Sequence, residues 1–384
     1  MTKRMFFSRE IKRGLVYGLA FVLVLACIAS VVTRAQNQAT SQDGTRQRRT
    51  DGAQPAARPT PTPTPDDVTV ESDDVVRVET DLTNILFTAI DKNKRFITEM
   101  RKEDIRIMED GSPQEIFTFE RQTDRPLSLA LLIDTSRSEE MTLPAEKRAA
   151  SAFVDSVMRP DKDEVAVVSF TGESTLEQGL TGNAARVRRA LDKVEFVPPS
   201  GYVGGGIVVP GTPPISDKNQ ALAGSTAIWD SVWVTSDEVL STTSDKTRRA
   251  IILLTDGQDT SSLKKMDEAI ERAIKNDVVI YAIGIGDMVQ FGINEGALKK
   301  VAERTGGRAF FPDSEAELRA AFQQIQLELR SQFLVAYSPS NKSRDGSFRK
   351  VQIEVVNPDL RKQNLRLNYR QGYFARSVTD TKKD

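Results

Sequence analysis

Two apolar runs that each end in an aspartate constrain the fold of this chain more than any other feature. Residues 129–141 read LALLIDTSRSEEM, so the first run ends at Asp134. Residues 249–256 read RAIILLTD, and the second run ends at Asp256. Short apolar runs of this kind are typical of parallel strands that are covered on both faces. Because open α/β sheets place ligands at the carboxyl ends of such strands, we expect both aspartates at one edge of one sheet.

The region around these runs alternates strands with helices. We expect helices over 144–158 and 262–275, strands over 164–170 and 278–285, and a last helix that begins with a capping box of Ser314 and Glu317. On the helix over 262–275, the residues expected to face the sheet are Leu263, Met266, Ile270 and Ile274. This alternation predicts an α/β fold, with a doubly wound, mainly parallel sheet and helices on both faces.

Hydroxyl side chains accompany the two aspartates. Ser136 and Ser138 follow Asp134 at alternate positions, and Thr226 stands at an expected helix start between the two strands. Carboxylates and hydroxyls without a soft donor suit a hard cation such as Mg²⁺. Each feature has an ordinary alternative, since Asp, Ser and Thr often cap helices and Asp256-Gly257 is a common turn. Three such features in this order favour one shared metal site.

Together these segments resemble a von Willebrand factor A-like domain over about residues 126–332. The matching residues are Asp134, Ser136 and Ser138 for the D-x-S-x-S pattern, Thr226 for the loop threonine and Asp256 for the aspartate of T-D-G. The resemblance implies a metal-ion-dependent adhesion site that holds Mg²⁺, with Mn²⁺ or Ca²⁺ as alternatives. It implies that the hydroxyls bind the cation directly, that the aspartates act partly through water, and that a partner's Asp or Glu fills the open position. The whole chain resembles the exported bacterial "VWFA-related" group, which carries β-rich flanks.

The sequence departs from the family pattern around the site. Gly224-Ser225 stands where the family usually has a glycine pair before the threonine. Residues 198–214 form a Gly/Pro-rich segment, which either shapes the rim of the site or is a tolerated surface insertion. Glu139 and Glu140 follow the D-x-S-x-S pattern directly. We interpret them as a solvated acidic first helical turn, with help in holding a second cation as the alternative.

The first 35 residues predict export. The basic residues Lys3, Arg4, Arg9, Lys12 and Arg13 precede an apolar run over 14–32. That run is about 19 residues long, enough to span a bilayer. Positive charge before such a run keeps the N-terminus in the cytoplasm and sends the rest across. Cleavage after Ala35, retention as a membrane anchor and lipidation at Cys27 stay open, and each places the protein in the cell envelope, periplasmic or extracellular.

The remaining segments divide the chain into regions. Residues 36–67 form a disordered Pro/Thr-rich linker that contains PTPTPTP. A β-rich part over 68–124, with alternation at Ile105 and Ile107 and at Phe117 and Phe119, precedes the α/β domain over 125–332. Strands over 333–375 follow, and then a polar tail over 376–384. We expect both flanks to form one small β-sandwich with the α/β domain inserted, and two separate β appendages are the alternative.

Composition narrows the function. The chain has 384 residues, with 53 basic against 54 acidic side chains and no basic stripe, so it gives no sign of a nucleic-acid binder. It has no histidine, and its one cysteine lies in the N-terminal apolar run, which excludes the common triads and thiolate metal sites. Phosphoryl-transfer enzymes of the haloacid-dehalogenase type need a second aspartate where Ser136 stands. Catalysis is therefore the least favoured class.

These observations predict an exported, metal-dependent protein-binding module, an adhesion or scaffold protein and not an enzyme. Its partner would be a protein that offers Asp or Glu to the cation. A structural envelope protein with a metal-stabilised fold and no external ligand is the first alternative, and a Mg²⁺-dependent phosphoryl-transfer enzyme is the second. The sequence leaves the partner, the metal and the oligomeric state open.

Overall fold

The computed structural model of the chain describes residues 82–121, 124–196, 198, 225–286 and 292–377, and the backbone of the short strands β8 (Tyr202–Gly204) and β9 (Ile207–Val208). The expected export segment with Cys27, the linker, Gly224 and most of the Gly/Pro-rich segment lie outside these residues. So do the first part of the β-rich flank and most of the polar tail. Within the described part, no helix is long and apolar enough to cross a membrane.

A six-stranded sheet forms the centre of the α/β region. Its strands lie in the order β12 (Ala309–Phe310), β11 (Val278–Gly284), β10 (Arg248–Thr255), β5 (Leu127–Asp134), β6 (Glu164–Phe170) and β7 (Ser174–Thr181). Every neighbouring pair is parallel except β6 and β7, which are antiparallel. The expected doubly wound, mainly parallel sheet is confirmed.

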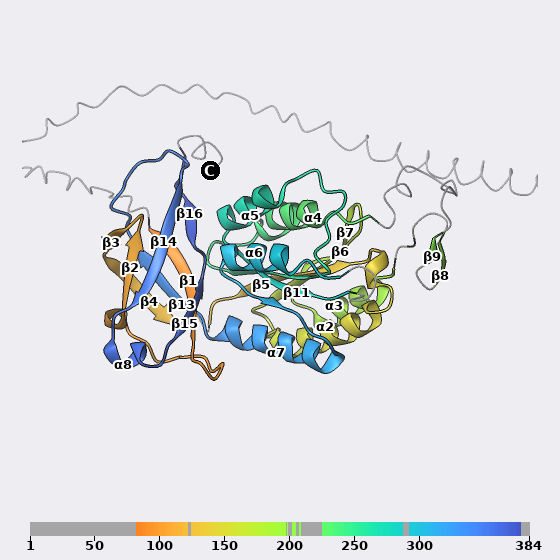
Figure 1. Cartoon of the computed structure of the whole chain (residues 1–384), viewed down its shortest axis with the longest axis horizontal. Coiled ribbons are helices and arrows are strands. Elements are labelled where there is room, and N and C mark those ends of the chain that lie inside the picture. Colours follow the sequence, from red (N-terminus) through yellow and green to blue (C-terminus); the bar gives the residue numbers. More distant parts are fainter. Residues whose placement is uncertain are drawn as a thin grey trace, which may run out of the picture. The chain divides into compact units, whose positions relative to one another are not determined.

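Helices cover both faces of this sheet (Figure 1). On one face the apolar core contains residues of α2 (Leu143–Val157), α3 (Ala184–Lys193) and α7 (Glu315–Arg330). On the other it contains residues of α4 (Ile228–Val234), which continues as the π-helix η4 (Thr235–Leu240), and of α5 (Met266–Lys275) and α6 (Glu295–Thr305). The sequence dictates this arrangement in β5, where Leu129 and Leu131 face the first core and Ala130 and Leu132 the second. A strand with period two and apolar residues on both faces must be covered twice.

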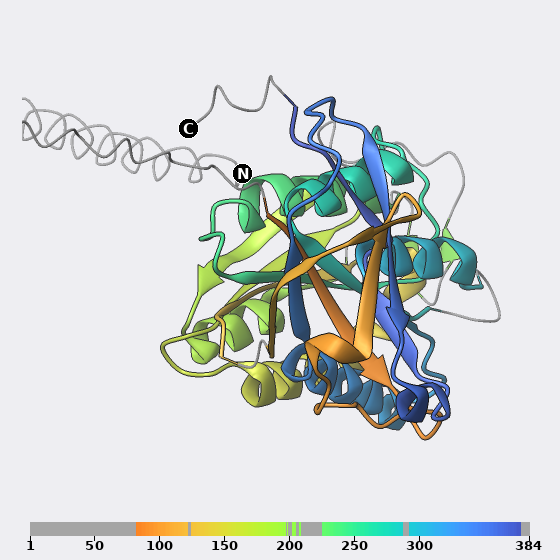
Figure 2. The same ribbon diagram turned by 90° about the vertical axis from the view of Figure 1, so that its left-hand side faces the viewer.

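Strands from both flanks build two antiparallel four-stranded sheets. One has the order β15 (Arg366–Tyr369), β1 (Thr83–Ile90), β13 (Phe333–Tyr337) and β4 (Ile116–Arg121). The other has the order β16 (Gly372–Phe374), β14 (Phe348–Val355), β2 (Ile105–Glu109) and β3 (Ser112–Gln114). Two short helices, η1 (Lys102–Asp104) and α8 (Pro358–Arg361), lie in their connections. Figure 2 shows the orange strands of the N-terminal flank interleaved with the blue strands of the C-terminal flank.

The two small sheets share one apolar core, which makes them an additional β domain. Phe87 of β1 and Val335 of β13 contribute from one sheet, and Ile107 of β2 and Val351 of β14 from the other. The hairpin between β2 and β3 turns at Asp110 and Gly111, whose φ angles of 47° and 81° fit the Asp-Gly signal in the sequence. The α/β region is thus inserted between the halves of a β-sandwich, as the fold class predicted.

Three local predictions were wrong or incomplete. Leu263 was expected to face the sheet, but α5 begins only at Met266 and Leu263 is 92% exposed in the preceding loop. Phe117 was expected to lie on the same face as Phe119, but a bulge between β4 and β13 turns it outward. At α7, Ser314 accepts a hydrogen bond from the Glu317 N–H, as a capping residue should. The Glu317 carboxylate, however, accepts from the N–H of the preceding Asp313, so the box is not reciprocal.

Candidate metal site

The first predicted ligand, Asp134, is held at the carboxyl end of β5. The parallel register pairs Ile133 with Leu254 of β10, which places Asp134 beside Thr255. The Thr255 hydroxyl donates to Asp134 Oδ2 at 2.6 Å, and the Ser136 N–H donates to Asp134 Oδ1 at 2.9 Å. Asp134 is fully buried. Its carboxylate is therefore fixed from both sides before any ligand arrives.

The two predicted serines lie in the loop that follows. Their hydroxyl oxygens are 3.2 Å apart, in mutual hydrogen-bond contact. Ser136 precedes the short 3₁₀ helix η2 (Arg137–Glu139), but its side chain makes no capping hydrogen bond to that helix. A helix cap therefore does not account for its hydroxyl. Ser138 in turn forms a side-chain hydrogen bond with Asp256, so this loop joins the ends of both strands.

Asp256 follows β10 directly and is also buried. Its Oδ1 accepts a hydrogen bond of 2.8 Å from the Gln258 N–H, and its carbonyl accepts one of 2.8 Å from the Asn294 N–H. Gly257 has a φ of +80°, and an added Cβ would lie 2.9 Å from Leu298 Cγ. Glycine is required there because both the backbone conformation and the space exclude a side chain. This turn aims Asp256 toward Asp134.

Thr226 reaches the same edge through backbone contacts. Its N–H donates to Thr260 Oγ1 at 2.8 Å, and its carbonyl accepts from the N–H groups of Thr260 and Ser261 at 2.9 and 3.0 Å. The N–H of Ala227 donates to the carbonyl of Thr171 after β6 at 2.7 Å. The residue at the N-cap position of α4 is Ala227 and not Thr226, so helix capping does not explain Thr226. The role of Thr226 and of the other four residues as ligands stays a prediction.

A third carboxylate, which sequence reasoning set aside, belongs to this cluster. Asp134, Glu139 and Asp256 each place an oxygen within 4.8 Å of the others. The interpretation of Glu139 as a solvated residue was wrong, because its side chain is fully buried. Glu146 is also buried, on the apolar face of α2 that carries Ala150 and Phe153. Helical spacing from those residues was the signal that could have placed Glu146 in the core.

Burial perturbs the ionisation of all four acids. It raises the pKa of Asp134 to about 7, against the hydrogen bonds from Thr255 and Ser136. It raises the pKa of Glu146 to about 7 and that of Glu139 well above its ordinary value, where the charges of Glu146 and Asp134 add to the effect. Loss of hydration also raises the pKa of Asp256. Buried carboxylates of this kind need a nearby positive charge to ionise at neutral pH.

The donor set fits a hard divalent cation. Every side chain gathered here offers oxygen, and within the described part of the chain at least one buried oxygen, Glu139 Oε1, has no hydrogen-bond partner. Carboxylate and hydroxyl oxygens are the ligands that Mg²⁺, Mn²⁺ and Ca²⁺ prefer. A bound cation would therefore stabilise the ionised form of these carboxyl groups and offset the repulsion among them.

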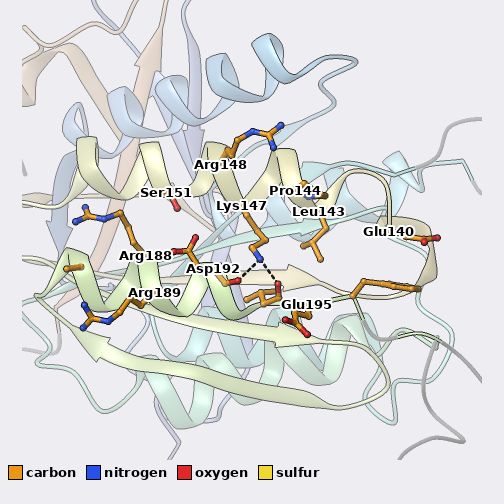
Figure 3. A pocket seen from close by; sticks show the side chains of 13 residues that line it. Glu140, Leu143, Pro144, Lys147, Arg148, Ser151, Arg188, Arg189, Asp192 and Glu195 are labelled. Carbon is orange, nitrogen blue, oxygen red and sulfur yellow. Dashed lines mark hydrogen bonds between the residues drawn. The ribbon is translucent and has the colours of Figure 1, made fainter. Parts of the chain in front are cut away.

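A separate cavity of about 860 Å³ lies between α2 and α3, with Glu140 in its lining (Figure 3). Two of the cationic groups in its lining, Lys147 and Arg148, already have partners. Lys147 Nζ donates to the carbonyls of Asp192 and Val194 at 2.7 Å each, and Arg148 pairs with Glu315 at 3.0 Å. The Lys147 contacts join α2 to the C-terminal end of α3, and the Arg148 contact joins α2 to α7.

An open, mainly parallel sheet that gathers carboxylates and hydroxyls at its carboxyl edge defines an α/β domain with a candidate cation site. Comparison of the sequence with models of known protein families identifies the family. One model of the von Willebrand factor type A domain matches residues 129–258, and a second model of the same domain matches residues 216–324. The two overlap and together span residues 129–324, which include most of β5, all of β10 and both buried aspartates. The chain belongs to the von Willebrand factor type A domain family.

Several solved structures are similar to this chain. Proximal thread matrix protein 1 from the mussel byssus, with a zinc-occupied MIDAS motif, is 22% identical with a TM-score of 0.43, over 59% of this chain and 50% of that one. BatB, a conserved hypothetical protein from Bacteroides thetaiotaomicron, is 19% identical with a TM-score of 0.39, over 53% and 100%. A von Willebrand factor type A structure from Catenulispora acidiphila is 14% identical with a TM-score of 0.42, over 78% and 74%. The chain spans about half the length of the mussel protein. No curated protein matches the sequence.

Proposed function

We propose that the chain is an exported, metal-dependent protein-binding module, which captures a partner through a carboxylate that completes the coordination of a divalent cation. The observation that carries this proposal is the meeting of Asp134, Asp256 and the Ser136–Ser138 hydroxyl pair at one sheet edge. Mg²⁺ is the expected ion, with Mn²⁺ or Ca²⁺ as alternatives. When bound, the cation would supply Lewis acidity toward an incoming Asp or Glu.

The residues of the site have two different roles, orienting the aspartates and holding the cation. The Thr255 hydroxyl and the Ser136 N–H orient Asp134, while the Gln258 N–H orients Asp256. Ser136 and Ser138 are neutral donors, so they would hold the cation without cancelling its charge. A site held in this way keeps affinity for a further anionic ligand. That property suits recognition of an acidic side chain on a partner protein.

We place the protein in the cell envelope on the strength of the basic flank and apolar run near its N-terminus. A binding role is favoured over catalysis because the chain has no histidine and because Ser136 stands where an acid–base aspartate would be required. The β-sandwich and any spacer before it would then present the cation site to a partner.

A structural role is the second candidate, and burial favours it. Asp134 is fully buried and Asp256 is 2% exposed, so a cation held by them would neutralise charge inside the fold. In that case the cation would raise thermal stability without making the protein bind a ligand. The two candidates therefore differ in whether the cation-bound protein also binds an acidic partner.

Selection from a phage library of random peptides on the full-length protein separates the two candidates. In Mg²⁺ we expect enrichment of peptides with a required Asp or Glu, release of these phages by EDTA, and no enrichment on Asp134→Asn. Asp155→Asn is the matched control, because Asp155 lies half exposed on α2 and pairs with Arg188 away from the strand ends. If Mg²⁺ stabilises the protein but no acidic peptide is enriched, the binding role is wrong and the structural role stands.

A further inference from the structure

Glu139 is buried beside the site, although it is not one of the five predicted ligands. It ends the short helix η2, one residue after Ser138, and its side chain is fully buried. The Thr142 hydroxyl donates to Glu139 Oε2 at 2.7 Å. Among the residues that the structure describes, none forms a hydrogen bond with Glu139 Oε1. A buried carboxylate oxygen without a donor is costly, so its retention calls for a ligand or a proton.

Glu139 belongs to the cluster in which the two aspartates meet. One carboxylate oxygen of each of Glu139, Asp134 and Asp256 lies within 4.8 Å of the others, a spacing that one cation can bridge. Gly286, just after β11, lies close to both Asp256 and Glu139. An added Cβ would lie 2.9 Å from Asp256 Cβ and 3.5 Å from Glu139 Oε1. The strand end therefore approaches this point closely and leaves no room for another side chain.

Glu146 is a second buried carboxylate near Glu139. It lies on α2, is fully buried, and neither of its carboxylate oxygens has a hydrogen-bond partner among the described residues. It is close enough to Glu139 for its charge to raise the pKa of the Glu139 carboxyl. Two buried carboxylates with few donors favour a positive charge beside them.

We propose that Glu139 is an additional ligand of the cation, coordinating it through Oε1 beside Asp134 and Asp256. This inference rests on the cation part of the proposed function and deepens it. A third carboxylate makes the site more anionic than two aspartates and two serines would. The chain should then bind its cation tightly before any partner arrives, and the cation would keep less attraction for a partner carboxylate than it would beside two aspartates alone.

The first test is a titration of the full-length protein with Mn²⁺, in which the electron paramagnetic resonance signal reports the free ion. Glu139→Gln should weaken Mn²⁺ binding at least about tenfold, in line with the loss of a ligand or its close support. Glu140→Gln is the matched control, because it removes the adjacent carboxylate, which is partly exposed and lies outside the cluster. Asp134→Asn should abolish binding. If Asp134→Asn loses binding while Glu139→Gln binds like wild type, this inference is wrong and the cation site stands.

The second test separates ligation from a packing role. Mn²⁺ should shift carboxylate stretching bands in the infrared difference spectrum, and Glu139→Gln should lack one band that Glu140→Gln retains. If Glu139→Gln does not fold, Glu139→Asp keeps the charge but retracts the oxygen, and it should still weaken binding. An unchanged set of shifted bands in a folded Glu139 variant would overturn the inference. A wild-type protein that binds no Mn²⁺ would overturn the proposed cation site as well.

Discussion

The Thr255 hydroxyl donates a hydrogen bond of 2.6 Å to the carboxylate of Asp134, and this bond joins the ends of β10 and β5. Both residues are fully buried. Thr255 also accepts a hydrogen bond of 3.1 Å from the Gly257 N–H, so the same hydroxyl fixes the turn that carries Asp256. One threonine thus positions both aspartates of the site.

Replacement of Thr255 by Val should lower the free energy of unfolding by about 1–3 kcal/mol. Valine has nearly the same shape as threonine, but Asp134 loses a buried hydrogen-bond donor. Urea denaturation measures the change. Thr175→Val on the exposed part of β7 is the matched control and should change stability by less than about 0.5 kcal/mol. An equal effect of the two substitutions would show that the hydroxyl of Thr255 has no special role.

Stability in EDTA should fall as the pH rises through neutrality. The folded-state pKa of Glu146 is about 7 against an ordinary 4.5, so folding gains stability from the bound proton below pH 4.5 and loses it as the pH passes 7. Asp134 acts in the same direction, from 3.8 to about 7. Each such carboxyl contributes on the order of 3 kcal/mol.

Chemical denaturation between pH 4.5 and 8 checks this dependence, with and without saturating Mg²⁺. The cation replaces the protons, so it should raise stability most at the alkaline end and flatten the curve. Glu146→Gln should flatten the curve in EDTA as well, because the amide does not ionise. A stability in EDTA that stays constant or increases from pH 5 to 8 would contradict the assigned burial of these acids.

Substitution of Gly286 by Ala should lower both stability and cation affinity. Gly286 has a φ of +152°, and an added Cβ would press against Asp256 at 2.9 Å. We expect a loss of about 1–3 kcal/mol from backbone strain and displacement of the carboxylate. Gly179→Ala in β7 is the control, since a Cβ there meets nothing within 4 Å. The melting temperature without Mn²⁺ measures the loss of stability, and its increase with Mn²⁺ measures cation binding. A Gly286→Ala protein that melts like the wild type in both conditions would contradict the close contact between Gly286 and Asp256.

The strands and their acidic ends could be predicted because the signal is local. The run before Asp134 is apolar at every position, and only a strand covered on both faces accommodates that pattern in a short segment. Two such strands in an alternating α/β region must be parallel neighbours or near neighbours, which brings Asp134 and Asp256 to one edge. The combination of the two flanks into one β domain was predicted on a different ground, namely that neither flank has enough strands to bury a core alone. In the structure β1 of one flank pairs with β13 of the other.

Other features depend on contacts between distant segments. Leu263 fits a helical stripe, yet the Asp230 carboxylate binds the N–H groups of Leu263 and Lys264 and keeps that stretch a loop. Phe117 fits an alternating strand, yet a bulge opposite Tyr337 shifts the register. Glu139 resembles an exposed residue at a helix start, and only the tertiary packing of α2 shows that it is buried. The local sequence pattern therefore does not predict these three features.

Isothermal titration of the full-length protein with Mg²⁺ and Mn²⁺, beside Asp134→Asn, shows whether a cation binds at the ends of β5 and β10. We expect saturable binding to the wild type and its loss in the variant. The melting temperature of the variant in EDTA should stay at or above that of the wild type, because one buried acid is neutralised. Absence of binding to the wild type, or equal binding to both proteins, would contradict a cation site at the ends of β5 and β10.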